Sequence, residues 1–291
     1  MRWTPGGGSD DIQDDRDSSG GGGFGGFHLG IGGFILVGIL SLVFHQNLFT
    51  LFSGGSTSAP VSRQQQVAQD RGEDREVQFV TFVQNDVQNT WTQVLPEIAR
   101  VPYRRAKLVL FRDVDRSGCG TAQAAIGPFY CPEDEKVYLD LGFFDELAQR
   151  FRAPGEFAQA YVIAHEFGHH VQKILGIEGK VRTLQQRAPS ERNPLSVRME
   201  LQADCFAGVW AHSSRQRGIV ENQDIPAGLQ AAASVGDDRL QRMARGRVSP
   251  ETFTHGSSAQ RVHWFSAGLD SGQVGACNTF RRSAPADSDQ Q

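Results

Sequence analysis

The segment at residues 161–172, YVIAHEFGHHVQ, contains an H-E-x-x-H motif in which His165 and His169 flank Glu166. Residues spaced i and i+4 lie one turn apart on the same face of a helix, so both imidazoles can reach one ion. The glutamate beside the first histidine can accept a proton from a metal-activated water. A chance match on a helix is the alternative, with odds on the order of one in a hundred. The motif therefore predicts a Zn²⁺ site with Glu166 as general base.

A catalytic zinc ion needs a third protein ligand and one open position. The segment RMELQADCFAGVW carries Glu200 and Asp204 at i and i+4 spacing. Such a pair usually marks a solvated helix face, but here it lies among apolar residues, where a carboxylate is costly unless its charge is compensated. A metal and a ligand histidine would compensate it. We therefore predict Glu200 as the third zinc ligand and Asp204 as the partner that fixes the tautomer of His165.

The elements that must position these residues are delimited by glycine and proline. We expect helices at 77–96, 155–175 and 193–217, and short strands at 107–111 and 136–141. Proline or glycine stands at both ends of the second and third helical ranges, as is typical of helix termini. The strand at 136–141 suits either a sheet core or an exposed edge along which a peptide could lie. The pattern predicts an α+β fold, mainly helical with a small sheet.

Composition divides the chain into segments. We expect a disordered Gly/Asp-rich tail at 1–26, a transmembrane anchor at 27–52, a linker at 53–76, the folded domain at 77–282 and a disordered C-terminal tail at 283–291. The apolar run from Leu29 to Phe52 is long enough to cross a bilayer. An acidic, Gly-rich stretch precedes it, which disfavours a cleaved signal peptide. Arginines stand on both sides, so the positive-inside rule leaves its orientation open.

The net charge of −4 and the scattered basic residues give no electrostatic footprint for nucleic acid, and the sequence indicates no oligomeric state. The cysteines are Cys119, Cys131, Cys205 and Cys277. From their number alone, two disulfides and four free thiols are equally compatible, and the anchor favours disulfides in an oxidising compartment. A Cys119–Cys131 bridge would close a short loop and contribute about 3 kcal/mol. Cys205–Cys277 follows by elimination. We therefore expect a single-pass protein of the cell membrane with an extracytoplasmic, periplasmic domain.

Motifs along most of the chain resemble the bacterial neutral zinc metallopeptidases, which are single-pass membrane proteins with H-E-F-G-H-H-x-Q and E-L-Q-A-D helices. The matching stretches are MRW at 1–3, CGTAQAAIGPFYCP at 119–132, VYLDLGFF at 137–144, AHEFGHHVQ at 164–172, ELQADCFAGVW at 200–210 and FTHGSSAQR at 253–261. The resemblance implies a zincin-like metallopeptidase domain and supports Glu200 as a zinc ligand.

A more distant resemblance is to gluzincins that carry T-H-x(5)-R after the third ligand, a pattern matched by Thr254, His255 and Arg261. In those enzymes the histidine faces the substrate and stabilises the transition state. The resemblance therefore implies that His255 is catalytic and donates to the developing oxyanion. Arg261 could fix its loop through carboxylate or carbonyl contacts. A surface histidine beside a C-terminal helix is the alternative interpretation.

The leading hypothesis is a zinc-dependent endopeptidase that acts on a peptide or an unfolded protein through a metal-activated water. The alternative is a membrane-anchored zinc-binding chaperone or interaction module without turnover. Glu166 and His255 argue against that alternative, because neither is needed merely to hold a metal. A structural membrane protein with an accidental motif is a third hypothesis, and the coupled Glu200–Asp204 pair argues against it.

Overall fold

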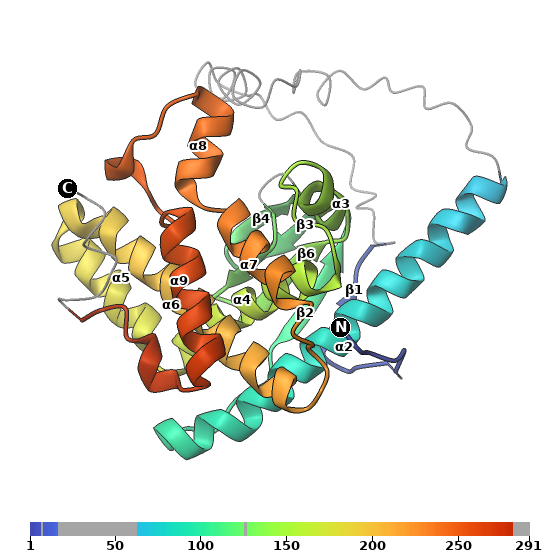
Figure 1. Ribbon diagram of the computed structural model, residues 1–291, viewed down its shortest axis with the longest axis horizontal. Coiled ribbons are helices and arrows are strands. Elements are labelled where there is room, and N and C mark those ends of the chain that lie inside the picture. Colours follow the sequence, from blue (N-terminus) through green and yellow to red (C-terminus); the bar gives the residue numbers. More distant parts are fainter. Residues whose placement is uncertain (7, 17–62, 125–126, 282–291) are drawn as a thin grey trace.

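The computed structural model describes residues 1–6, 8–16, 63–124 and 127–281, with the backbone alone for residues 63–72 (Figure 1). Its α-helices are α2 (Arg63–Ala99), α3 (Gly142–Gln149), α4 (Glu156–Ile174), α5 (Ile177–Arg187), α6 (Arg192–Gln216), α7 (Ile225–Ser234), α8 (Asp237–Arg245) and α9 (Ser258–Ser271). Its strands are β1 (Ile12–Asp14), β2 (Lys107–Phe111), β3 (Val114–Ser117), β4 (Gly120–Gln123), β5 (Phe129–Cys131) and β6 (Lys136–Asp140). Short 3₁₀ helices are η3 (Pro189–Glu191), η4 (Pro250–Thr252) and η5 (Val274–Cys277).

Four strands form a sheet in the order β1-β2-β6-β5, and β3 and β4 form a separate antiparallel pair. Strands β1 and β6 run parallel to β2, whereas β5 runs antiparallel to β6. Because β6 has a neighbour on each side, the segment considered as a possible edge is a central strand, and the edge strands are β1 and β5. The mainly helical chain with small sheets confirms the predicted α+β class.

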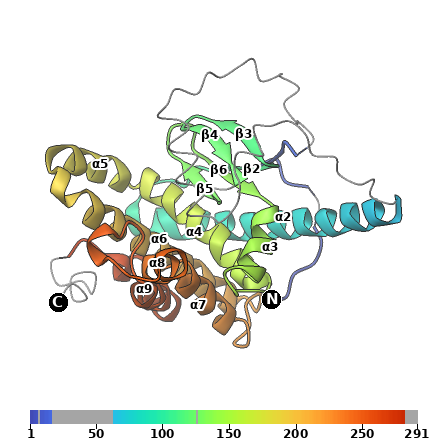
Figure 2. The same cartoon turned by 90° about the horizontal axis from the view of Figure 1, so that it is seen from above.

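Helix α4 lies at the centre of the domain. It contacts β5 and β6 on one side and α6 and α7 on the other, as Figure 2 shows from above. Its residues from Phe157 to Phe167 are almost all buried, including Tyr161. An element buried on nearly every face holds its side chains in fixed positions, which a catalytic site requires.

Glycine allows α6 to approach its neighbours closely. A Cβ placed on Gly208 would lie 2.1 Å from the carbonyl oxygen of Phe265 on α9. A Cβ on Gly168 of α4 would lie 3.0 Å from the carbonyl oxygen of Ala203 on α6. Gly168 therefore serves the contact between the two ligand-bearing helices. Larger residues at Gly168 or Gly208 would push these helices apart.

The N-terminal residues differ from the expected disordered tail. Strand β1 pairs with β2 in register, with Ile12 opposite Leu108. The Trp3 ring packs edge-on against Phe79 at 5.3 Å between centroids. The prediction was wrong for residues 1–6 and 8–16, because Trp3 and Ile12 find apolar partners on α2 and β2 that local composition does not reveal.

Helix α2 begins at Arg63, so the expected polar linker ends earlier than predicted and residues 63–76 belong to a helix that enters the domain. Apolar side chains at helical spacing along α2 are buried, including Val83 and Trp91. The helix continues past Pro96 and ends before Arg100, whose φ of 54° is left-handed. A proline this close to the C-terminus removes one backbone donor without breaking the preceding turns.

The predicted disulfides Cys119–Cys131 and Cys205–Cys277 are both present, with Cα–Cα distances of 5.8 and 5.4 Å. The first joins the β3–β4 turn to β5, and the second joins α6 to η5. They tie the segments that follow β3 and α9 to the elements around the candidate site.

The predicted anchor at 27–52 and the predicted tail at 283–291 lie outside the described residues, as do 17–26, 53–62 and 282. Within the ranges given above, no helix combines the length and apolar character that a membrane crossing needs.

Candidate metal centre

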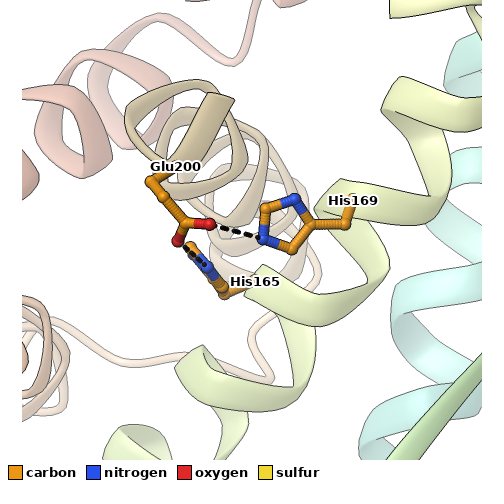
Figure 3. A group of neighbouring side chains, drawn as sticks. All are labelled: His165, His169 and Glu200. Carbon is orange, nitrogen blue, oxygen red and sulfur yellow. Dashed lines mark hydrogen bonds and ion pairs between the residues drawn. The ribbon is translucent and has the colours of Figure 1, made fainter. Parts of the chain in front are cut away.

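His165 and His169 on α4 meet Glu200 on α6, and the three side chains point toward one another (Figure 3). One ligand atom from each lies within 4.8 Å of the others. Glu200 Oε2 is 3.2 Å from His165 Nε2, and Glu200 Oε1 is 3.4 Å from His169 Nε2. Two ligands of a tetrahedral zinc ion lie roughly 3.3 Å apart, given bonds of about 2.0–2.1 Å. Two imidazole nitrogens and one carboxylate thus fit zinc in chemistry and in spacing.

Asp204 fixes the ring of His165 from the side opposite Glu200. Its Oδ1 lies 2.8 Å from His165 Nδ1, which is the predicted contact, and it also accepts from the Tyr161 hydroxyl. Because Asp204 accepts, His165 carries its proton on Nδ1 and directs the Nε2 lone pair toward the centre. Burial raises the pKa of Asp204, but Arg261 and His165 together hold it below its ordinary value.

Arg261 makes contacts of the predicted kind with different partners. Its Nε and Nη2 donate to the two carboxylate oxygens of Asp204, both at 2.8 Å, and Nη1 donates to the carbonyl of Val235 at 3.3 Å. The guanidinium thus neutralises the carboxylate that orients a ligand. The prediction that Arg261 fixes the loop of His255 is not supported by these contacts.

Asp237, at the start of α8, holds that loop instead. Its Oδ2 accepts from the backbone N–H groups of Thr254, His255 and Gly256 at 2.7, 2.6 and 3.1 Å. Its Oδ1 lies 3.2 Å from His255 Nδ1. This hydrogen bond raises the pKa of His255 from 6.5, against the effect of burial. A charged imidazole is therefore favoured there over a wider pH range than for a free histidine.

Glu166 lies beside the first ligand in a nearly enclosed position. Its exposed fraction is 8%. Burial raises the pKa of this carboxyl above its ordinary value of 4.5, although the neighbouring His165 and His169 act in the opposite direction. A carboxylate with a raised pKa is a stronger base near neutral pH, as a general base should be.

His169 is oriented by a residue that the sequence analysis did not select. Its Nδ1 lies 2.9 Å from Oε1 of Gln172, one turn further along α4. The adjacent His170 points away from this centre and is buried, with Nδ1 3.0 Å from the Tyr130 hydroxyl and Nε2 2.7 Å from the Arg104 carbonyl. His170 thus links α4 to β5 and the segment before β2.

A cavity of about 570 Å³ opens beside these groups. It is lined by His165, Glu166, His169, Glu200, His255 and Arg261, by residues of β5 and the segment before it (Gly127, Pro128, Phe129 and Tyr130), and by apolar side chains that include Phe143, Phe151, Val162, Met199 and Leu240. The structure therefore places all the proposed catalytic and metal-binding residues on one cavity.

Three contributors were missed from the sequence: Tyr161, Gln172 and Asp237. The first two had a signal, because they stand at i−4 from His165 and i+3 from His169 and so share the ligand face of the helix. Asp237 had none, since its contact with His255 joins the start of α8 to the loop before α9.

Residues 1–280 match the family described as "Putative neutral zinc metallopeptidase". The Escherichia coli (strain K12) protein named "Uncharacterized protein YpfJ" is 48% identical over 289 residues, which cover 97% of this chain and 100% of that protein. The Mycobacterium tuberculosis (strain ATCC 25618 / H37Rv) protein named "Uncharacterized protein Rv2575" is 43% identical over 207 residues, covering 67% of this chain and 68% of that protein. No solved structure matches the chain.

Proposed function

We propose, from the premise that this chain belongs to the neutral zinc metallopeptidase family, that it is a zinc-dependent endopeptidase. One observation carries the proposal. Three zinc-type donors lie within 4.8 Å of one another, and Glu166 lines the same cavity beside them. A purely structural zinc site is closed by protein ligands, whereas a hydrolytic site has three protein ligands and access for substrate.

Each residue of the site has its own role in hydrolysis. His165, His169 and Glu200 hold the ion, which when bound supplies Lewis-acid polarisation of the scissile carbonyl and lowers the pKa of water. Glu166 accepts a proton from the attacking water and passes it to the leaving amine. His255 donates a hydrogen bond to the oxyanion that develops in the transition state. Asp237 favours the protonated imidazole that this donation requires.

Strand β5 is the element on which we propose that substrate lies. It is one of the two edge strands of the four-stranded sheet, and its residues Phe129 and Tyr130 line the cavity. An edge strand offers unpaired backbone donors and acceptors to an extended peptide. Binding along an edge requires no free terminus, which favours cleavage within a chain over removal of terminal residues.

Two assays test this function with the purified full-length protein: a cleavage assay, followed by mass spectrometry of its products. The first incubates zinc-loaded protein with an unfolded polypeptide, then adds a chelator, then restores zinc. We expect cleavage that the chelator abolishes and zinc restores. Mass spectrometry of the products should find both new termini within the substrate sequence.

Ligand variants provide the control. His165→Ala and Glu200→Ala should lose zinc and activity together. If the Glu200→Ala protein held zinc at full affinity, the proposed ligand set would be refuted. If the unfolded substrate were bound and kept soluble but never cut, the chaperone alternative would replace the peptidase.

We also propose that the domain is extracytoplasmic, at the cell membrane. The two disulfides support this location, because such bonds persist in oxidising compartments and are rare in the cytosol. Peptide mapping without reductant, on protein extracted from cells with thiols blocked, should recover both bridges. Four free thiols in that extract would refute the location.

A further inference from the structure

Two motif glutamines have no part in the proposed function so far. Gln172 ends AHEFGHHVQ, and Gln202 stands in ELQAD. Both are buried, with exposed fractions of 0% and 5%. A buried amide is costly unless its donors and acceptors are satisfied, so their partners indicate what they do.

The partners form a chain of hydrogen bonds that begins at a metal ligand. His169 Nδ1 is 2.9 Å from Gln172 Oε1, and Gln172 Nε2 donates to Gln202 Oε1 at 3.1 Å. Gln202 Nε2 donates to the backbone carbonyl of Cys277 at 2.9 Å. The chain thus runs from α4 through α6 to η5, which the Cys205–Cys277 disulfide attaches to α6.

Backbone carbonyls fix the direction of this chain. Gln172 Nε2 also donates to the carbonyl of Met199 at 2.7 Å. A carbonyl only accepts, so the amide nitrogen of Gln172 must face Met199 and its oxygen must face His169. A ring nitrogen facing an amide oxygen must carry the proton. His169 is thereby held as the Nδ1–H tautomer, with its Nε2 lone pair directed at Glu200.

We propose that Gln172 is the positioning residue for His169, and that Gln202 and the disulfide-held Cys277 carbonyl hold Gln172 in place. Each zinc-binding histidine then has its own supporting contact. Asp204 supports His165, and the hydrogen-bonded chain Gln172–Gln202–Cys277 carbonyl, here called the glutamine relay, supports His169. The inference rests on the proposed zinc site but not on peptidase activity. Partners of this kind are typically worth 10–100-fold in metal affinity.

Zinc affinity, measured by competition with a chromogenic chelator, tests the relay in the full-length protein. Gln172→Leu removes the acceptor for His169, and we expect zinc binding to weaken roughly 10–100-fold. Gln172→Glu removes the donor to Met199 and Gln202 but keeps an acceptor for His169. We expect its zinc affinity to stay within about threefold of wild type, since the ligand retains its support. Gln202→Leu should weaken binding by a smaller factor, because the Met199 carbonyl still holds Gln172.

A matched control separates positioning from general loss of packing. Gln88 on α2 is a fully buried glutamine that accepts from the Ala106 N–H at 2.7 Å. Gln88→Leu should lower the melting temperature of the metal-free protein and leave zinc affinity unchanged. Gln172→Glu should also lower the melting temperature. If this destabilised variant keeps its zinc affinity, a weakened affinity in Gln172→Leu cannot be explained by loss of stability alone.

Equal zinc affinities in Gln172→Leu and Gln172→Glu, whether both normal or both weak, would overturn the relay. A protein that binds zinc in the expected order but cleaves nothing would leave the relay standing and refute the peptidase. A wild-type protein without zinc affinity would overturn both.

A second inference comes from the N-terminal residues, which form part of the domain. The Met1 amine pairs with Asp224 at 2.8 Å, and the Arg2 N–H donates to the Ile219 carbonyl at 2.8 Å. The Trp3 ring packs on α2 and lies under the Arg75 guanidinium. These contacts join residues 1–3 to α2 and to the segment between α6 and α7.

Residues 9–16 continue the attachment along the sheet. Ser9 Oγ donates to Asn85 on α2 at 2.9 Å, and Asp11 accepts from the Arg105 guanidinium. The Leu108 N–H donates to the Asp11 carbonyl at 2.8 Å, and strand β1 follows. Backbone pairing, an aromatic contact and ion pairs together attach residues 1–16 to the domain by a specific interface.

We infer that residues 1–16 and the domain occupy the same side of the membrane. A single crossing between residues 16 and 63 would place them on opposite sides and break every contact just described. These contacts are incompatible with a single-pass topology that separates residues 1–16 from the domain.

Labelling of single introduced cysteines tests this in spheroplasts that express the full chain. All four native cysteines are in disulfides, so wild type provides the background. Gly6→Cys and Glu251→Cys each place a thiol at an exposed position, in the N-terminal segment and in the domain. A membrane-impermeant maleimide should modify both in intact spheroplasts.

Modification of both only after lysis would also support a shared side, and would refute the extracytoplasmic location instead. Modification of one in intact spheroplasts and of the other only after lysis would overturn the inference.

Discussion

Arg261→Met tests the buried charge network that orients His165. The guanidinium and the Asp204 carboxylate are 5% and 0% exposed, and two hydrogen bonds of 2.8 Å join them. Breaking a buried pair by removing one partner costs about 3–5 kcal/mol, because the other charge is left uncompensated. Asp204 would keep its contacts with Tyr161 and His165. We therefore expect the lower end of that range, about 3 kcal/mol.

Urea unfolding of the metal-free, full-length protein measures this loss of unfolding free energy, with the wild type and every variant in the same detergent. Arg104→Met is the matched control, because its pair with Glu135 is exposed on both sides. That change should cost less than about 1 kcal/mol. A double variant that combines Arg261→Met with Asp204→Asn should be less destabilised than the sum of its single changes, since the second change removes the stranded charge. A cost below about 1 kcal/mol for Arg261→Met, or strict additivity, would refute the reasoning.

Three further predictions concern the site and its frame. His255→Ala should keep zinc and lower kcat roughly a hundredfold or more, with a much smaller change in KM; an unchanged kcat would remove His255 from the mechanism. Asp237→Asn keeps an acceptor for the loop but removes the charge that raises the pKa of His255. Because activity is lost as pH rises through that pKa, the alkaline limb of the kcat profile should move to lower pH; an unmoved limb would contradict the role of Asp237. Replacing Cys205 and Cys277 by alanine removes a disulfide between residues that are 72 positions apart. Denaturant titration should show an unfolding free energy lower by about 4 kcal/mol. A loss below about 1 kcal/mol would contradict the account.

The elements that carry the ligands could be predicted because their signals are local. Gly155 precedes α4 and Gly176, with φ of 69°, follows it, so both ends of that helix are visible in the sequence. The apolar strand at 107–111 was equally plain, and it is β2. The ligand histidines follow from helical spacing alone, and Glu200 from the cost of burying a carboxylate.

What could not be predicted depends on contacts between distant residues. Trp3 lies in a stretch whose composition indicates disorder, and its ring partners Phe79 and Phe82 lie far along the chain on α2. Arg261 could not be assigned to Asp204 rather than to the His255 loop without knowing how closely α9 packs on α6. Tyr161 and Gln172 are exceptions, since their positions on the ligand face of the helix were available from the sequence.

The most direct test of the central claim compares wild type with Glu166→Gln at equal zinc occupancy. The variant keeps all three ligands and nearly the same side-chain shape but cannot accept a proton. We expect the wild type to cleave a quenched fluorescent, unfolded substrate, and the variant to do so roughly 10²–10⁴-fold more slowly. Equal rates at equal zinc content, or no cleavage by the zinc-loaded wild type, would contradict the proposed function.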